Sequence, residues 1–128
     1  MKFTPKSPAR RYTVGHAVKS EILDCGEMAL VPNEQITFTT EGGSEHDVTR
    51  KSFGFYATQS LNARLPEHGL RPVLLRSLVT NRYFIFLVER GKGDAFQAYV
   101  AQEQMEIVTW LDTTEALDRI RSGLRDGR

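Results

Sequence analysis

The sequence has little of what usually marks a specialised protein. It contains one cysteine and a net charge of +1, and it has no apolar run near the roughly 18 residues of a membrane span. A single cysteine excludes an internal disulfide, which fits a reducing compartment. The balanced charge makes nucleic acid an unlikely partner, because nucleic-acid-binding domains carry a basic excess. Without a signal-peptide pattern, we expect a cytoplasmic protein that does not contact a membrane.

The sequence also lacks a motif for catalysis, a cofactor or a metal. It has no local Ser-His-Asp, Cys-His or paired-carboxylate arrangement. Glu45, His46 and Asp47 are adjacent, but neighbouring strand residues point to opposite faces and cannot grip one ion together. We therefore interpret them as a solvated hairpin end. Cys25 lies between two apolar stretches, where we expect a small buried thiol.

The composition predicts one folded domain. The chain has 128 residues, of which 40% are apolar and 26% charged, and a chain of this size can bury its own core. Residues 1–15 contain four basic residues and no acid, and Pro5 and Pro8 exclude a helix. We therefore expect a flexible basic arm at 1–15, a single domain at 16–124 and a frayed tail at 125–128.

Apolar periodicity predicts strands in the first half of the domain. Two strands joined by a turn at Cys25-Gly26 are expected within residues 18–31. A hairpin should pair Gln35–Glu41 with Glu45–Thr58 across a glycine turn. The apolar side of its second strand changes face near Arg50–Ser52, which predicts a bulge there. Residues 59–71 are polar and should form a long loop.

The second half predicts a hairpin followed by a β-α-β-α order. Tyr83–Val88 is apolar at every position, so this strand should be central and covered on both faces. The expected elements are strands Val73–Val79 and Tyr83–Arg90, a helix from Asp94 to about Gln104, strand Met105–Leu111 parallel to its predecessor, and a helix after Asp112.

These patterns together predict the fold class. We expect an α+β fold built on a mostly antiparallel sheet or partly open barrel, with two C-terminal helices and the order β-β-β-β-β-β-α-β-α.

One stretch, KSFGFYAT at Lys51–Thr58, resembles a strand that stacks on RNA bases. Lys51, Phe53, Gly54 and Phe55 match the octamer of RNA-recognition domains. The upstream partner strand of that fold would carry an aromatic residue, and the segment here has none. We therefore favour a core strand, in which Phe53 and Phe55 are buried.

Two groups of residues are candidate binding sites. The first follows the polar loop, where Arg and Tyr could anchor a partner and Asn could both donate and accept hydrogen bonds. It comprises Arg50, Lys51, Tyr56, Asn62, Arg64 and His68. The second is a possible anion site where a strand passes through a glycine-rich turn into a helix. It comprises Arg90, Gly91, Lys92 and Gly93.

These observations favour a non-catalytic binding or accessory module. Its expected partner is another protein, a second copy of itself or a small anionic ligand. One alternative is a small enzyme that acts on an anionic substrate. Another is weak binding of single-stranded RNA through KSFGFYAT.

Overall fold

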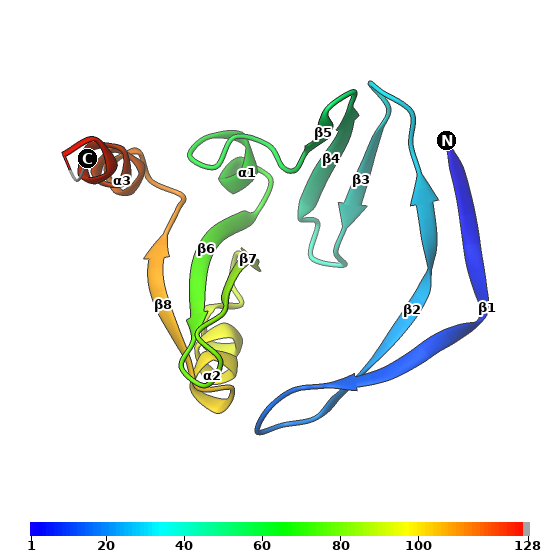
Figure 1. Ribbon diagram of the computed structural model, residues 1–128, viewed down its shortest axis with the longest axis horizontal. Coiled ribbons are helices and arrows are strands. Elements are labelled where there is room, and N and C mark those ends of the chain that lie inside the picture. The colour runs from blue at the N-terminus through cyan, green and yellow to red at the C-terminus, as the bar shows by residue number, and fades with distance from the viewer. Residues whose placement is uncertain (127–128) are drawn as a thin grey trace.

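The strands of the computed structural model, which describes residues 1–126, form three separate antiparallel sheets along an open arc (Figure 1). This confirms an α+β fold with two C-terminal helices, and the described strands do not close into a barrel. The elements are β1 (Lys2–Val14), β2 (Ser20–Ala29), β3 (Gln35–Thr39), β4 (Glu45–Lys51), β5 (Gly54–Tyr56), α1 (Arg64–Glu67), β6 (Leu70–Ser77), β7 (Tyr83–Glu89), α2 (Gly93–Gln102), β8 (Met105–Trp110) and α3 (Thr114–Asp126).

The N-terminal hairpin of β1 and β2 replaces the flexible arm that we expected. Prolines exclude a helix, but they are compatible with an edge strand or a bulge, and the register of β1 shifts between Pro5 and Arg10. β2 is one continuous strand rather than two strands joined by a turn at Gly26. At the other end of the chain, α3 extends into the expected tail as far as Asp126. Residues 127–128 lie outside the described residues.

The hairpin is amphipathic. Residues that pair directly across two antiparallel strands point to the same face. Tyr12 pairs with Ile22, and Phe3 pairs with Met28. These two pairs and Val14 therefore form one apolar face, which an ion pair between Arg10 and Asp24 crosses. The opposite face is mostly polar and includes Arg11, which binds Glu21.

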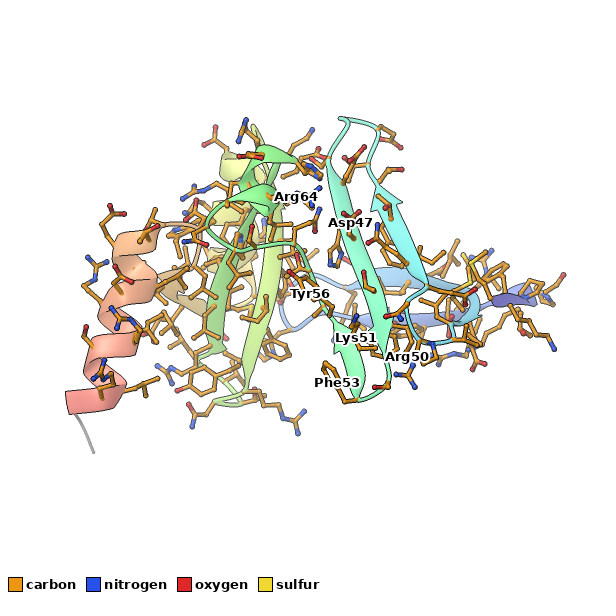
Figure 2. All side chains as sticks on the ribbon, turned by 90° about the horizontal axis from the view of Figure 1, so that it is seen from above. Asp47, Arg50, Lys51, Phe53, Tyr56 and Arg64 are labelled. Atoms are coloured by element: carbon orange, nitrogen blue, oxygen red, sulfur yellow. The ribbon has the colours of Figure 1, made fainter. Side chains whose placement is uncertain are left out.

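The second sheet confirms the predicted hairpin of β3 and β4 but not the bulge. The chain turns at Ser52 and Phe53, so that β5 returns along β4 and pairs Arg50 with Phe55. Figure 2 shows Arg50, Lys51 and Phe53 together near this turn. This turn, and not a bulge, explains why the apolar residues change face near Arg50–Ser52, because a new strand begins after it.

The third sheet carries the main core. Its order is β7-β6-β8, so β6 is central and β7 is an edge strand. The prediction that Tyr83–Val88 is central and covered on both faces was therefore wrong for the chain by itself. β8 runs parallel to β7, as expected, but β6 lies between them. α2 covers one face of this sheet, and the core contains Val73, Leu75, Val88, Phe96 and Val100.

Capping differs from the sequence patterns at both C-terminal helices. Asp94 and Gln97 have the spacing of a capping box, but Lys92 caps α2 and makes no side-chain bond. At α3, Thr113 Oγ1 accepts a hydrogen bond from the Ala116 amide at 3.1 Å, which leaves Asp112 free to bind Arg71. Leu124, which follows the inward-facing Ala116 at helical spacing near the end of α3, is exposed. No helix among the described residues is long and apolar enough to span a bilayer.

Candidate functional site

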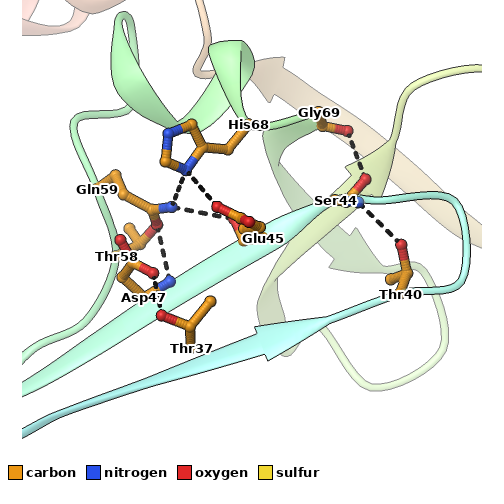
Figure 3. A network of polar contacts seen from close by, with 9 residues as sticks. All are labelled: Thr37, Thr40, Ser44, Glu45, Asp47, Thr58, Gln59, His68 and Gly69. Atoms are coloured by element: carbon orange, nitrogen blue, oxygen red, sulfur yellow. Dashed lines mark hydrogen bonds and ion pairs between the residues drawn. The ribbon is translucent and has the colours of Figure 1, made fainter.

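The best-organised polar cluster lies where β4 meets the end of α1, and Gln59 is its centre (Figure 3). The Gln59 side chain is 5% exposed. Its Nε2 donates to the Glu45 carbonyl at 3.0 Å, and its Oε1 accepts from the Asp47 amide at 3.1 Å. The side-chain amide therefore bonds β4 as a neighbouring strand would, and it fixes the polar loop onto the second sheet.

The orientation of Gln59 determines the hydrogen-bonding role of His68. Because the Glu45 carbonyl can only accept and the Asp47 amide can only donate, the Gln59 amide cannot be flipped. Its nitrogen lies 3.2 Å from His68 Nδ1, which must accept, so neutral His68 carries its proton on Nε2. Glu45 Oε2 lies 3.5 Å from the same Nδ1. If Nδ1 were protonated, it could no longer accept from Gln59 and would instead donate to Glu45 in an ion pair.

His68 also lines an open depression of about 580 Å³ beside this cluster. The depression brings together His68 from the first predicted site and Arg90 and Lys92 from the second. Its lining residues are Gly42, Gly43, Ser44, Glu45, Glu67, His68, Gly69, Glu89, Arg90 and Lys92.

The wall of this depression depends on close contacts between polar groups and glycines. Ser44 is buried, and its hydroxyl donates to the Gly69 carbonyl at 3.3 Å. Gly69 has a φ of +91°, and a Cβ there would lie 2.8 Å from Ser44 Oγ. Both the backbone conformation and the contact with Ser44 therefore require glycine at position 69.

The charges of the depression do not favour an anion. The Thr40 hydroxyl, which donates to Glu89 Oε2, holds the pKa of that carboxyl below its usual value, which keeps it ionised. Three carboxylates, from Glu45, Glu67 and Glu89, face only two permanent cations. Arg90 is engaged by the Pro66 carbonyl at 2.6 Å. The predicted anion site, Arg90–Gly93, thus lies in an acidic environment.

The remaining predicted site residues lie elsewhere. Lys51 Nζ donates to Asn33 Oδ1 at 2.9 Å, and Arg50 donates to the Gly54 carbonyl at 3.1 Å. Asn62 donates to Thr114 Oγ1 at 3.1 Å and so links the polar loop to α3. Arg64 is exposed on α1 and lies apart from Arg50 in Figure 2. The six residues do not form one site.

The aromatic residues of KSFGFYAT are exposed. Phe53, Phe55 and Tyr56 are 85%, 62% and 56% exposed, so the prediction of buried phenylalanines was wrong. The guanidinium of Arg50 lies 5.7 Å from the centroid of the Phe55 ring. The β4–β5 turn therefore presents aromatic rings to solvent beside two half-buried cations, Arg50 and Lys51.

Cys25 and the Glu45–Asp47 stretch were the other candidate ligands in the sequence. Cys25 is exposed on the hairpin rather than buried. Among the described residues, no cluster of His, Cys, Asp and Glu could hold a metal. His46 Nε2 lies 2.9 Å from the Ala57 carbonyl, and Asp47 accepts from Thr37 Oγ1 at 2.6 Å. These side chains support the second sheet.

A second depression, also about 580 Å³, lies where the tip of the hairpin approaches α2 and β7. The carboxylate of Glu103 accepts hydrogen bonds from the backbone amides of His16 at 2.8 Å and Ala17 at 3.0 Å. The Ala17 amide, followed by that of His16, lowers the pKa of Glu103. This anion holds the hairpin tip against the third sheet.

Sequence reasoning missed Gln59, Ser44, Glu89 and Glu103. A polar residue in a loop gives no local signal that it will be buried. The close glycines at 42–43 and 69 were the available hint, since a glycine often marks a close approach of two backbones.

Comparisons of the chain with protein-family models, with curated proteins and with solved structures gave no match.

Proposed function

We propose that the protein is a non-catalytic binding module that acts in complex with a protein partner. One observation carries the proposal. The chain exposes 9133 Å² to solvent, whereas a compact monomer of its 14.5 kDa mass should expose about 6,900 Å². The excess, roughly 2,200 Å², is well above the roughly 800 Å² that each partner buries in a standard interface.

The excess surface is rich in apolar side chains. Among the described residues, eight hydrophobic residues are buried, and 22 large hydrophobic residues are exposed. Single exposed apolar residues are normal, but contiguous patches mark interaction sites. The hairpin of β1 and β2 adds to this argument, because an isolated two-stranded hairpin is only marginally stable in water. We expect the module to act in the cytoplasm.

Amide hydrogen exchange of the dilute protein tests this function. Without a partner, we expect β1 and β2 to exchange rapidly, whereas β6 should be strongly protected because it is central in a sheet with a core. A monomer whose hairpin is as protected as β6 would contradict the proposal, because its apolar surface would then need no partner.

The aromatic turn supports a second candidate, weak binding of single-stranded RNA. Exposed rings stack on unpaired bases, and nearby cations contact phosphates. Phe53 and Phe55 are exposed beside Arg50 and Lys51. An enzyme that acts on an anionic substrate has less support, because carboxylates outnumber permanent cations in the depression at His68.

A titration with a short mixed-sequence RNA tests this candidate. If Phe53→Ala with Phe55→Ala abolishes the NMR shifts of Lys51–Thr58, and if affinity falls as salt rises, the rings stack on bases and phosphates are contacted. Inorganic phosphate is the control ligand. Binding that does not change with salt would exclude this function.

A further inference from the structure

The hairpin and the third sheet each have an apolar face that the chain itself leaves open. On the hairpin this face contains Phe3, Tyr12, Val14, Ile22 and Met28, all of which are exposed. Apart from its tip, the hairpin extends away from the third sheet in Figure 1. A ribbon with one apolar face is stable when another layer covers that face.

The open part of the third sheet lies opposite α2, on the β7 side, because Leu70 and Pro72 of β6 on the same face are buried. Alternation along β6 and β7 places Val73, Leu75 and Phe86 on the α2 side, and therefore Leu74 and Ile85 on the other side. Tyr83 shares this second face and, like Ile85, is more than half exposed. Arg76, which pairs directly with Tyr83, lies on the same face and binds Glu106, so an ion pair borders the apolar residues. The short helix α1 packs on β6, but it is a single turn and leaves these residues of β7 in solvent.

One chain cannot bring these two faces together. The hairpin tip is held by Glu103, at the end of α2. It lines the depression that also contains Phe84, Phe86 and Tyr99. Phe86 lies on the α2 side of the sheet, so the tip is fixed on the side opposite Ile85. Val14 lines this depression, so one end of the hairpin's apolar face already lies beside the chain's own third sheet. The rest of that face, with Phe3, Tyr12, Ile22 and Met28, must find its cover on another molecule.

We propose that this molecule is a second copy of the same chain, and that two copies exchange hairpins. The apolar face of each hairpin packs on the open face of the partner's third sheet, around Leu74, Tyr83 and Ile85. This inference rests on the proposed function and specifies its partner. A two-fold exchange makes both contacts identical and leaves no unsatisfied surface to extend a chain of copies.

The exposed area matches what such a dimer needs. Obligate dimers bury about 2,000–5,000 Å² in total, or roughly 1,000–2,500 Å² from each chain. The excess estimated from the 9133 Å² of exposed surface, about 2,200 Å², falls in this range. The charges agree with a copy rather than an oppositely charged partner. Arg11 already binds Glu21, and both Lys6 and Arg10 bind Asp24.

Sedimentation of the full chain over a wide concentration range tests the inference. We expect a particle of twice the 14.5 kDa chain mass. Ile22→Glu should raise the dissociation constant at least tenfold, because it places a charge in the contact. Leu23→Glu is the matched control. It adds the same charge at the next residue, on the opposite face beside Arg11, and should change the constant less than threefold.

A mixing experiment protects this test against misfolded variants. Ile85→Glu should weaken dimerisation as Ile22→Glu does, because each damages both contacts of its own dimer. A mixture of the two variants can form a dimer in which one hairpin and one sheet face are both unaltered. The mixture should therefore associate at least threefold more tightly than either variant alone, and a misfolded variant could not produce this recovery.

The possible failures are distinguishable. If neither Ile22→Glu nor Leu23→Glu changes the dissociation constant of the dimer, the hairpin exchange is overturned. A monomer at all concentrations, with β1 and β2 exchanging rapidly, would overturn self-association but leave a binding module that needs a different protein. A monomer with a protected hairpin would overturn both proposals.

Discussion

The third sheet and the N-terminal hairpin are both antiparallel β-structures with apolar residues, yet only the sheet has a buried core. The two regions differ in the segment that connects their strands. Residues 90–104 leave β7, form α2 and return to the same sheet as β8, so the connection itself supplies the covering layer. The connection between β1 and β2 is a short turn and covers nothing. An apolar face in the sequence predicts that the face will be buried. Whether the chain itself covers that face depends on the segments that connect its strands.

The largest expected difference between the two regions is in the cost of removing an apolar side chain. Leu75 is fully buried in the core. Leu75→Ala should lower the free energy of unfolding by about 2–5 kcal/mol, through lost burial and a cavity. In the dilute protein, where nothing covers the hairpin, Ile22→Ala should lower the free energy of unfolding by about 0.5 kcal/mol or less. Urea unfolding of both variants measures the contrast. Equal losses would mean that the hairpin already has a complete cover.

A glycine that joins the second and third sheets should give the next largest effect. Gly69→Ala should cost about 2–3 kcal/mol, because a left-handed backbone disfavours alanine by roughly 1–2 kcal/mol and the new methyl disturbs a hydrogen bond of Ser44. Gly91→Ala is the matched control, since Gly91 has a φ of +86° and open space around its Cβ position. Thermal unfolding compares them. Identical losses would show that the Ser44 contact contributes nothing.

The polar cluster centred on Gln59 should contribute less to the free energy of unfolding. Gln59→Ala removes the partners of the Glu45 carbonyl and the Asp47 amide, and should cost about 1–3 kcal/mol. Thr58→Ala, which loses one hydroxyl donor to Gln59, should cost about 1 kcal/mol or less. Urea unfolding again provides the comparison. If Gln59→Ala were the milder change, water would have to replace the amide at both backbone groups.

The smallest effect concerns the contact between the hairpin tip and the third sheet. The folded pKa of Glu103 lies below its ordinary 4.5, so its contribution is complete above pH 4.5 and is lost as pH falls through the folded pKa. The Ala17 amide should therefore exchange faster, after correction for intrinsic rates, as pH drops below 4.5. In Glu103→Gln the corrected rate should not change with pH over this range. A pH-independent wild type would contradict the role of the anion.

The strands and helices were largely predictable from the sequence, because the alternation of Ile36 with Phe38 and the stripe of Phe96 with Val100 are local patterns. Which strand would be central was not predictable. The six consecutive apolar residues at Tyr83–Val88 indicate a strand that is covered on both faces. They do not indicate whether the second cover comes from the same chain or from another. The strand position of Lys2–Val14 was also hidden, since it depends on pairing with β2.

The candidate sites were less predictable. The sequence indicated His68 and the turn at Arg90–Gly93, and the fold brings them to one depression. It did not indicate Gln59, whose burial depends on the polar loop closing over β4. Glu103 had no local signal either, because its partners are backbone amides near the other end of the chain.

The contact between His16 and Glu103 spans 87 residues of sequence, and this spacing also has a consequence in time. A ribosome adds roughly 5–20 residues per second, so Glu103 is made about 4–17 s after His16. During that interval the nascent hairpin has neither the anion that holds its tip nor the complete third sheet of its own chain. Its apolar face must therefore remain soluble on its own, or be shielded by a chaperone, until the chain is nearly complete.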